Sequence, residues 1–136
     1  MPLITWKDEM NVGVRELDDD HRRIIELLNQ LYDGVLAGKS TKELVNIFSS
    51  LMQETKFHLA HEERLLAKCN FPETAEHHKQ HDIMLTKGLK LQARFMSGST
   101  EPFTMEAVDQ TREWLEKHIL ESDSVYSPFL KAHGIV

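Results

Sequence analysis

The sequence predicts an all-α fold, an up-down-up-down antiparallel four-helix bundle that carries an N-terminal arm. Turn residues divide the chain into this arm and four segments of about 17 to 28 residues each. Every segment has apolar residues at helical spacing and little of the alternation that marks a strand. The connections between the segments are short, and short loops join antiparallel neighbours in a bundle.

The arm spans residues 1–17, and the first helix is expected over about 18–37. Asp18 or Asp19 would be the N-cap of this helix, because a short polar side chain there can accept a free backbone N–H. Gly38 lies just past the expected end of the helix, where glycine is favoured. Apolar residues interspersed among polar ones predict that the arm lies ordered on the bundle; they are Trp6, Met10, Val12 and Val14.

The second helix has the clearest start signal in the chain. The residues S-T-K-E, from Ser40 to Glu43, form a capping box in which the two end residues satisfy each other's free amides. The helix is therefore expected over 41–68, before a turn around Pro72.

Two further helices are expected, over 72–96 and over 105–121. The fixed φ of Pro72 suits a first helical turn. Residues 122–136 are expected to be a C-terminal tail, because Pro128 is typical of a helix that ends nearby.

The bulk properties exclude several classes of protein. A length of 136 residues predicts one domain over 1–136, and a net charge of −6 with no basic cluster argues against nucleic acid as a partner. No apolar run reaches the roughly 18 to 20 residues of a membrane helix, and the N-terminus lacks the pattern of a signal peptide. The single cysteine, Cys69, cannot form an internal disulfide and is expected to be a buried structural thiol. We therefore expect a monomer in the cytoplasm.

Eight histidines in so short a chain are the feature that decides the function. At about 100° per residue, five of them and one carboxylate fall on the apolar faces of the four helices. This inward-facing set consists of His21, His58, Glu62, His77, His81 and His118. By the same construction His61 lies at a helix edge, whereas His78 and Glu63 face solvent.

Any one of these histidines could be an ordinary core residue whose ring nitrogens find local partners. Five together would leave several buried polar groups unpaired at roughly 1 to 3 kcal/mol each, against a total stability of about 5 to 15 kcal/mol. A metal removes this cost, and imidazole and carboxylate ligands suit Fe, Zn, Cu or Mn. The set exceeds the four ligands of a zinc site, whereas two six-coordinate ions that share carboxylates would use it fully, so a di-iron site fits best.

The order and spacing of these residues resemble the hemerythrin family, and more narrowly its single-domain bacterial members. The motifs are H-x-x-x-E in the second helix, H-x-x-x-H in the third, and H-x-x-x-x-D from His118 to Asp123. The approaches L-D-x-x-H to His21 and W-L-x-x-H to His118 also match, so the likeness covers essentially the whole chain.

The resemblance implies two Fe ions per chain. One iron would be held by His77, His81 and His118 and the other by His21 and His58, with Glu62, Asp123 and a solvent-derived oxo or hydroxo group as bridges. The second iron would have an open position that takes O2. Asp123 lies about 140° round an ideal helix from His118, so the helix must unwind or tighten there, and helical spacing alone favours Glu121.

The residues expected around the O2 position are apolar; they are Ile25, Leu59, Trp114 and Leu115. The chain departs from the family in two places, with Leu59 where an aromatic residue is common and Asp20 where Gln is common. Both departures bear on oxygen affinity and oxidation rate.

The expected function is reversible O2 binding for storage, delivery or scavenging, without enzymatic activity. Oxygen-activating di-iron bundles use four carboxylates, whereas this chain offers five neutral imidazoles and two carboxylates, which favours the ferrous pair. Two alternatives stay open: an oxygen or redox sensor that signals through a partner protein, and a peroxidase or nitric-oxide-consuming enzyme.

Overall fold

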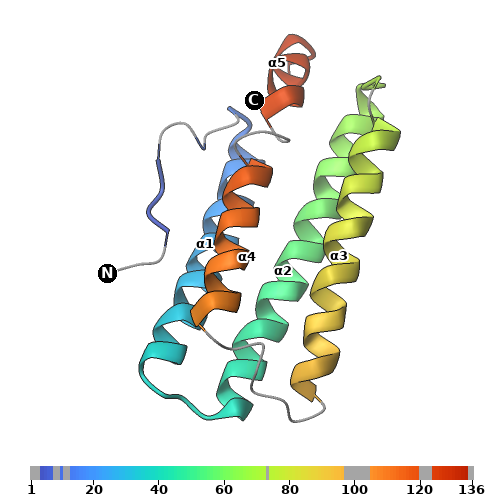
Figure 1. The fold of residues 1–136 in the computed structure, drawn as a ribbon. Helices are drawn as coiled ribbons and strands as arrows, with labels where there is room; N and C mark the ends of the chain where they lie inside the picture. The colour runs from blue at the N-terminus through green and yellow to red at the C-terminus, as the bar shows by residue number, and fades with distance from the viewer. Residues whose placement is uncertain are drawn as a thin grey trace.

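The computed structural model describes residues 4–7, 10, 13–72, 74–96, 105–119 and 124–134, with the backbone alone at 91, 94–96, 105–107, 110, 114, 117 and 124–126. Four long helices form an antiparallel bundle, and a short fifth helix lies at one end of it (Figure 1). The helices are α1 (Arg15–Leu36), α2 (Thr41–Lys68), α3 (Thr74–Met96), α4 (Met105–Lys117) and α5 (Ser124–Ala132). These ranges contain no strand, so the predicted all-α bundle is confirmed.

As expected for helices joined by short loops, α1 packs against α2 and α2 against α3, and α1 also packs against α4. The main core lies between α1, α2 and α4. Its most buried side chains include Leu28, Ile24, Phe48, Val108 and Ile119.

The first helix begins earlier than the sequence predicts. Its N-cap is Val14, which has no side chain to cap the helix, and Asp18 and Asp19 lie inside the helix, so the predicted N-cap is wrong. Val14 and Leu17 are almost fully buried, and burial of these two side chains outweighs the capping that an aspartate could offer.

The start of α2 has one of the two hydrogen bonds of the predicted capping box, since the backbone N–H of Glu43 donates to Ser40 Oγ at 3.2 Å. The helix ends at Lys68, and Asn70 takes a left-handed φ of 55° that turns the chain toward α3. The third helix begins at Thr74, two residues after the predicted start at Pro72.

The last part of the chain differs most from the prediction. The α-helical part of α4 ends at Lys117 and continues as a π turn over 118–119. The predicted tail 122–136 contains α5, with Pro128 inside it rather than after a helix end. Pro128 is the fifth residue of α5, so it removes at most one backbone hydrogen bond of the helix.

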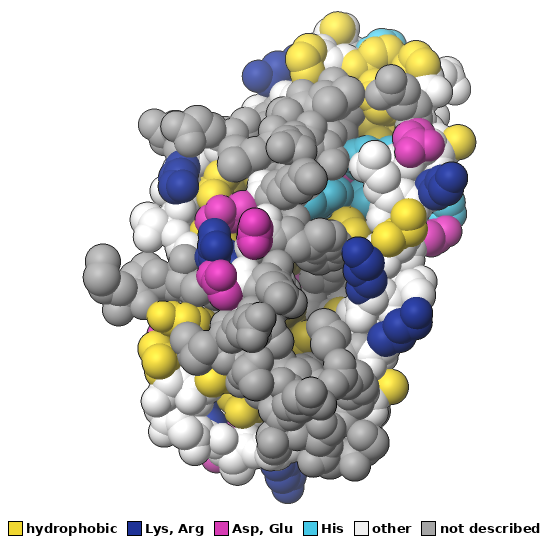
Figure 2. Space-filling view, in the orientation of Figure 1, with side chains coloured by type: hydrophobic (Ala, Val, Ile, Leu, Met, Phe, Trp, Pro, Cys, Tyr) yellow, Lys and Arg dark blue, Asp and Glu magenta, His cyan; other side chains and the backbone are white. Residues whose placement is uncertain are grey.

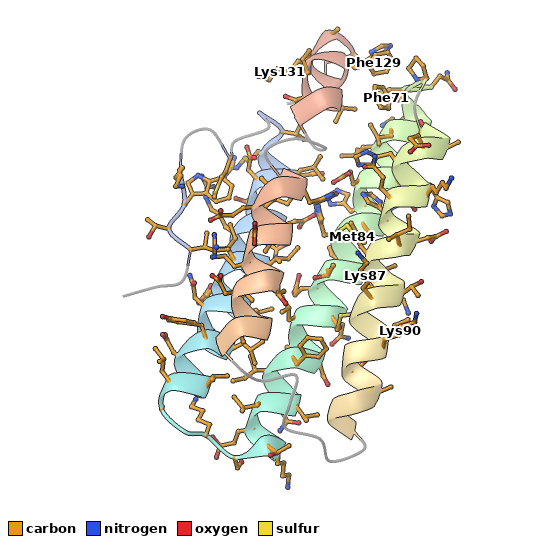
Figure 3. The ribbon with its side chains drawn as sticks, in the orientation of Figure 1. Phe71, Met84, Lys87, Lys90, Phe129 and Lys131 are labelled. Carbon is orange, nitrogen blue, oxygen red and sulfur yellow. The ribbon has the colours of Figure 1, made fainter. Side chains whose placement is uncertain are left out.

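The short helix α5 completes a second, smaller core, here called the end core. Its buried members are Val14, Leu17, Leu66, Cys69 and Leu130, with Phe71 and Phe129 packed against them. The rings of Phe71 and Phe129 meet edge to face at 5.1 Å, where α5 covers the turn between α2 and α3 (Figure 3). The burial of Cys69 agrees with its predicted structural role.

The described part of the N-terminal arm lies on the bundle, as predicted. Asn29 on α1 binds the backbone of Ile4 twice, since its Oδ1 accepts from the Ile4 N–H and its Nδ2 donates to the Ile4 carbonyl, both at 2.9 Å. The Arg22 guanidinium lies 4.6 Å from the centre of the Trp6 ring. These contacts hold the buried side chain of Ile4 against the main core.

Within the residues described above, none of the helices combines the length and the apolar character needed to cross a membrane.

Replacing Asn29 tests whether the arm is held by these two hydrogen bonds. We expect Asn29→Ala to lower the free energy of unfolding by about 1 to 3 kcal/mol and to speed proteolysis within the arm. Urea denaturation and limited proteolysis measure the two effects. The neighbouring exposed Gln30, changed to Ala, is the matched control, and equal stability of the two variants would contradict the expectation.

Candidate metal centre

All six inward-facing residues predicted from the helical pattern are buried. Each has less than a tenth of its surface exposed; the set is His21, His58, Glu62, His77, His81 and His118. They come from four parts of the bundle, with one on α1, two on α2, two on α3 and one on the π turn after α4. In the space-filling view, histidine side chains gather in the half of the molecule that lies near α5 (Figure 2).

Glu62 is the central residue of the group, with none of its surface exposed. Its Oε2 atom lies 3.0 Å from His58 Nε2, and its Oε1 atom lies 3.2 Å from His81 Nε2 and also contacts His77 Nε2. The two oxygens of one carboxylate therefore face two separate groups of imidazoles.

The first group joins α1 to α2. His21 Nε2 and His58 Nε2 lie 2.9 Å apart, and their rings meet at an angle of 67°. Two nitrogens that bind one ion at about 2.1 Å and at right angles lie about 3 Å apart, so this pair has the spacing of two ligands of one metal. With Glu62 it forms a triad whose ligand atoms all lie within 4.8 Å of one another.

The second group joins α2 to α3 and to the turn after α4. The rings of His77 and His81 are 4.4 Å apart, and Glu62, His77 and His81 form a second triad within 4.8 Å. The His118 ring lies 5.5 Å from His81 and 6.2 Å from His77. The structure thus gathers three imidazoles on one side of Glu62 and two on the other.

Asp20 takes part in this site in a way that the sequence pattern did not reveal. It is buried, and its Oδ2 accepts from His58 Nδ1 at 3.1 Å and from His61 Nδ1 at 2.9 Å. Burial alone would raise the pKa of Asp20, but the hydrogen bonds and charges of His58 and His61 outweigh it, so the pKa lies below its usual value.

The prediction that Glu63 is a solvated charge is wrong. Its Oε1 accepts from His81 Nδ1 at 3.2 Å and from His78 Nδ1 at 2.6 Å. His78 itself is exposed, as predicted, and the hydrogen bond to Glu63, with the charges of Glu63 and Asp82, raises the pKa of this imidazole. A wheel of one helix could not reveal these contacts because they cross between helices.

The remaining predicted site residues are only partly described. Asp123 lies outside the described residues, as does the side chain of Trp114. Ile25, Leu59 and Leu115 are buried apolar side chains. The chain changes from α-helical winding to a π turn over 118–119, at the place where the sequence analysis expects the helix to unwind or tighten.

A buried carboxylate between five convergent imidazoles is a set of donors that fits divalent transition metals. This fit agrees with the comparisons with known proteins. The model of the family described as the hemerythrin HHE cation binding domain matches residues 12–130. The chain belongs to the hemerythrin family.

Relatives within the family align over nearly the whole chain. The bacteriohemerythrin of Stenotrophomonas maltophilia (strain R551-3) is 31% identical over 135 residues, which cover 98% of this chain and 85% of that protein. The bacteriohemerythrin of Methylococcus capsulatus (strain ATCC 33009 / NCIMB 11132 / Bath) is 29% identical over 97% of this chain and its own full length.

The fold agrees with that of hemerythrin crystal structures. The wild-type hemerythrin structure superposes with a TM-score of 0.85 at 27% identity and covers 94% of this chain and 98% of its own. A point mutant of hemerythrin gives a TM-score of 0.87 over 96% of this chain and 98% of that one. The hemerythrin family is known for binding O2 at a non-haem di-iron centre.

The burial of the histidines can be tested chemically. We expect diethyl pyrocarbonate to modify the exposed His78 and His133 rapidly and the five buried imidazoles slowly, because the reagent must reach a ring nitrogen. Peptide mass spectrometry over a time course measures each site. Modification of all eight histidines at one rate in the folded protein would contradict the buried arrangement, and denatured protein is the control in which one rate is expected.

Proposed function

We propose that this hemerythrin-family chain binds O2 reversibly at a di-iron centre, for storage, delivery or scavenging of oxygen. The observation that carries the proposal is the position of Glu62, a fully buried carboxylate whose two oxygens face opposite groups of imidazoles. One carboxylate oriented in this way can serve two metal ions at once.

The contacts support a division of the ligands between two irons. His77, His81 and His118 would hold one iron, and His21 and His58 the other, with Glu62 as a bridge. Asp123 is proposed as the second bridge from the spacing of the family motif, with a solvent-derived oxo or hydroxo group as the third. The iron with two imidazoles then has fewer protein ligands, which leaves one position for O2.

Two irons held there would supply the electrons that O2 binding requires. The chain itself contributes ligands of low charge, since five of the seven proposed ligands are neutral imidazoles. Such a shell favours the ferrous state and so favours release of O2 over its use in an oxidation. Bundles that activate O2 for attack on substrates instead use four carboxylates.

The apolar side chains near the ligands support reversibility as well. Ile25 lies four residues after His21, Leu59 directly follows His58, and Leu115 precedes His118 by three residues, and all three are buried. We propose that they line the O2 position together with Trp114. An apolar lining restricts the access of water and protons, which would otherwise promote irreversible oxidation.

The metal content of the protein gives the first test. Protein purified without added metal is expected to contain two irons per chain, and Glu62→Ala is expected to lower both occupancies because it removes a ligand of both ions. Elemental analysis measures the metals, and circular dichroism checks that the helices remain. The exposed Glu76, changed to Ala, is the matched control. One zinc per chain, or two irons retained in Glu62→Ala, would refute the proposed site.

Reversible O2 binding gives the second test. The anaerobically reduced protein is expected to change its visible spectrum on addition of O2 and to regain the reduced spectrum when O2 is removed under vacuum. His118→Ala removes a proposed iron ligand and is expected to abolish the response, whereas the exposed His133→Ala keeps it. Sustained consumption of O2, peroxide or nitric oxide with saturation kinetics would instead favour an enzyme.

A further inference from the structure

We propose that Asp20 and Glu63 are positioning residues, one for each half of the metal centre, that orient a ligand imidazole and add negative charge to it. The inference rests on the proposed function, because it takes His58 and His81 to be iron ligands. It concerns two acids that do not themselves belong to the ligand set.

Asp20 fixes the ring of His58 from the neighbouring helix. Its side chain is only 3% exposed, and its Oδ2 lies 3.1 Å from His58 Nδ1, while Oδ1 binds Arg23. A carboxylate has no hydrogen to donate, so Nδ1 of His58 must carry the proton of this hydrogen bond. The other nitrogen, Nε2, then keeps its lone pair and points toward Glu62 and His21.

Glu63 does the same for His81 on the other side of Glu62. Its Oε1 lies 3.2 Å from His81 Nδ1, which leaves His81 Nε2 directed at Glu62. The acids come from different helices, Asp20 from α1 and Glu63 from α2, and each binds an imidazole of the next helix. Each therefore fixes a ligand across a helix interface.

The two halves share one further detail. In each, a single carboxylate oxygen accepts from two Nδ1 atoms, one of the buried ring and one of a more exposed ring. The more exposed ring is the half-buried His61 for Asp20, at 2.9 Å, and the exposed His78 for Glu63, at 2.6 Å. The Nε2 atoms of these two rings each face a second acid: His61 faces Glu16 at 3.0 Å, and His78 faces Asp82 at 3.3 Å.

Because the same arrangement occurs in both halves, we infer that His61 holds Asp20 in place and that His78 holds Glu63 in place. Each acid is bound by the exposed ring as well as by the ligand ring, so it cannot turn away from the ligand without losing both contacts. Partners of this kind typically change metal affinity by about 10- to 100-fold when they are removed, and they raise the basicity of the ligand. Greater basicity favours the more positive, oxidised iron, so loss of the charge is expected to raise the reduction potential.

The experiment separates two properties of the Asp20 and Glu63 carboxylates: the oxygen that accepts the hydrogen bond and the negative charge. Asp20→Ala and Glu63→Ala remove both, whereas Asp20→Asn and Glu63→Gln keep an oxygen that can accept from the ring and remove only the charge. The exposed Asp19→Ala and Glu76→Ala are controls. Anaerobic competition for ferrous iron with a chromogenic chelator measures affinity, spectroscopic redox titration measures the potential, and circular dichroism of the metal-free protein checks the fold.

We expect the two Ala variants to bind iron about 10- to 100-fold more weakly and the Asn and Gln variants to stay within a few-fold of the parent. All four are expected to have a higher reduction potential than the parent and the controls. If an Ala variant does not fold, the amide variant at the same position decides the question through its potential.

Unchanged affinity in a folded Ala variant, or an unchanged potential in the amide variants, would overturn the inference. In both cases the parent still binds two irons, which distinguishes this result from failure of the proposed function. In that failure the parent itself lacks the two irons.

Discussion

The arrangement of this molecule depends on one buried carboxylate. Transfer of an ionised Glu62 into a bundle core costs several kcal/mol unless charged or hydrogen-bonding partners compensate it. The imidazoles of His58, His77 and His81, from α2 and α3, face its two oxygens, and metal ions bound between these rings and the carboxylate would supply that compensation. Helices α1 and α4 must then bring their own imidazoles to the same depth, so the register of the whole bundle is fixed around one side chain.

The features predicted correctly from the sequence are those that one helix determines by itself. The start of α2 follows from Ser40 and Glu43, which lie one turn apart, and burial of His58 and Glu62 follows from their place on an apolar face. Local rules succeed here because the competing tertiary forces point in the same direction.

The features that were missed depend on contacts between elements distant in sequence. Burial of Leu17 by α5 residues moved the start of α1 ahead of the aspartates that a local rule selects. Asp20 and Glu63 have unremarkable positions on their own helices, and only the neighbouring helix supplies the imidazoles that bind them. The sequence does place His61 three residues after His58 and Glu63 next to Glu62. A helical wheel of one helix cannot show that these side chains bind partners on another helix.

The end core links the two ends of the chain to the site. Leu17 and His21 are one helical turn apart on α1, and Glu62 and Leu66 are one turn apart on α2, so this core lies directly beside the buried ligands. This core contains both Val14 and Leu130. Bringing these two residues together closes a loop that includes all of the chain between them, which costs conformational entropy. Burial of the end core must therefore offset the entropy that is lost when residues 14 and 130 are brought together beside the site.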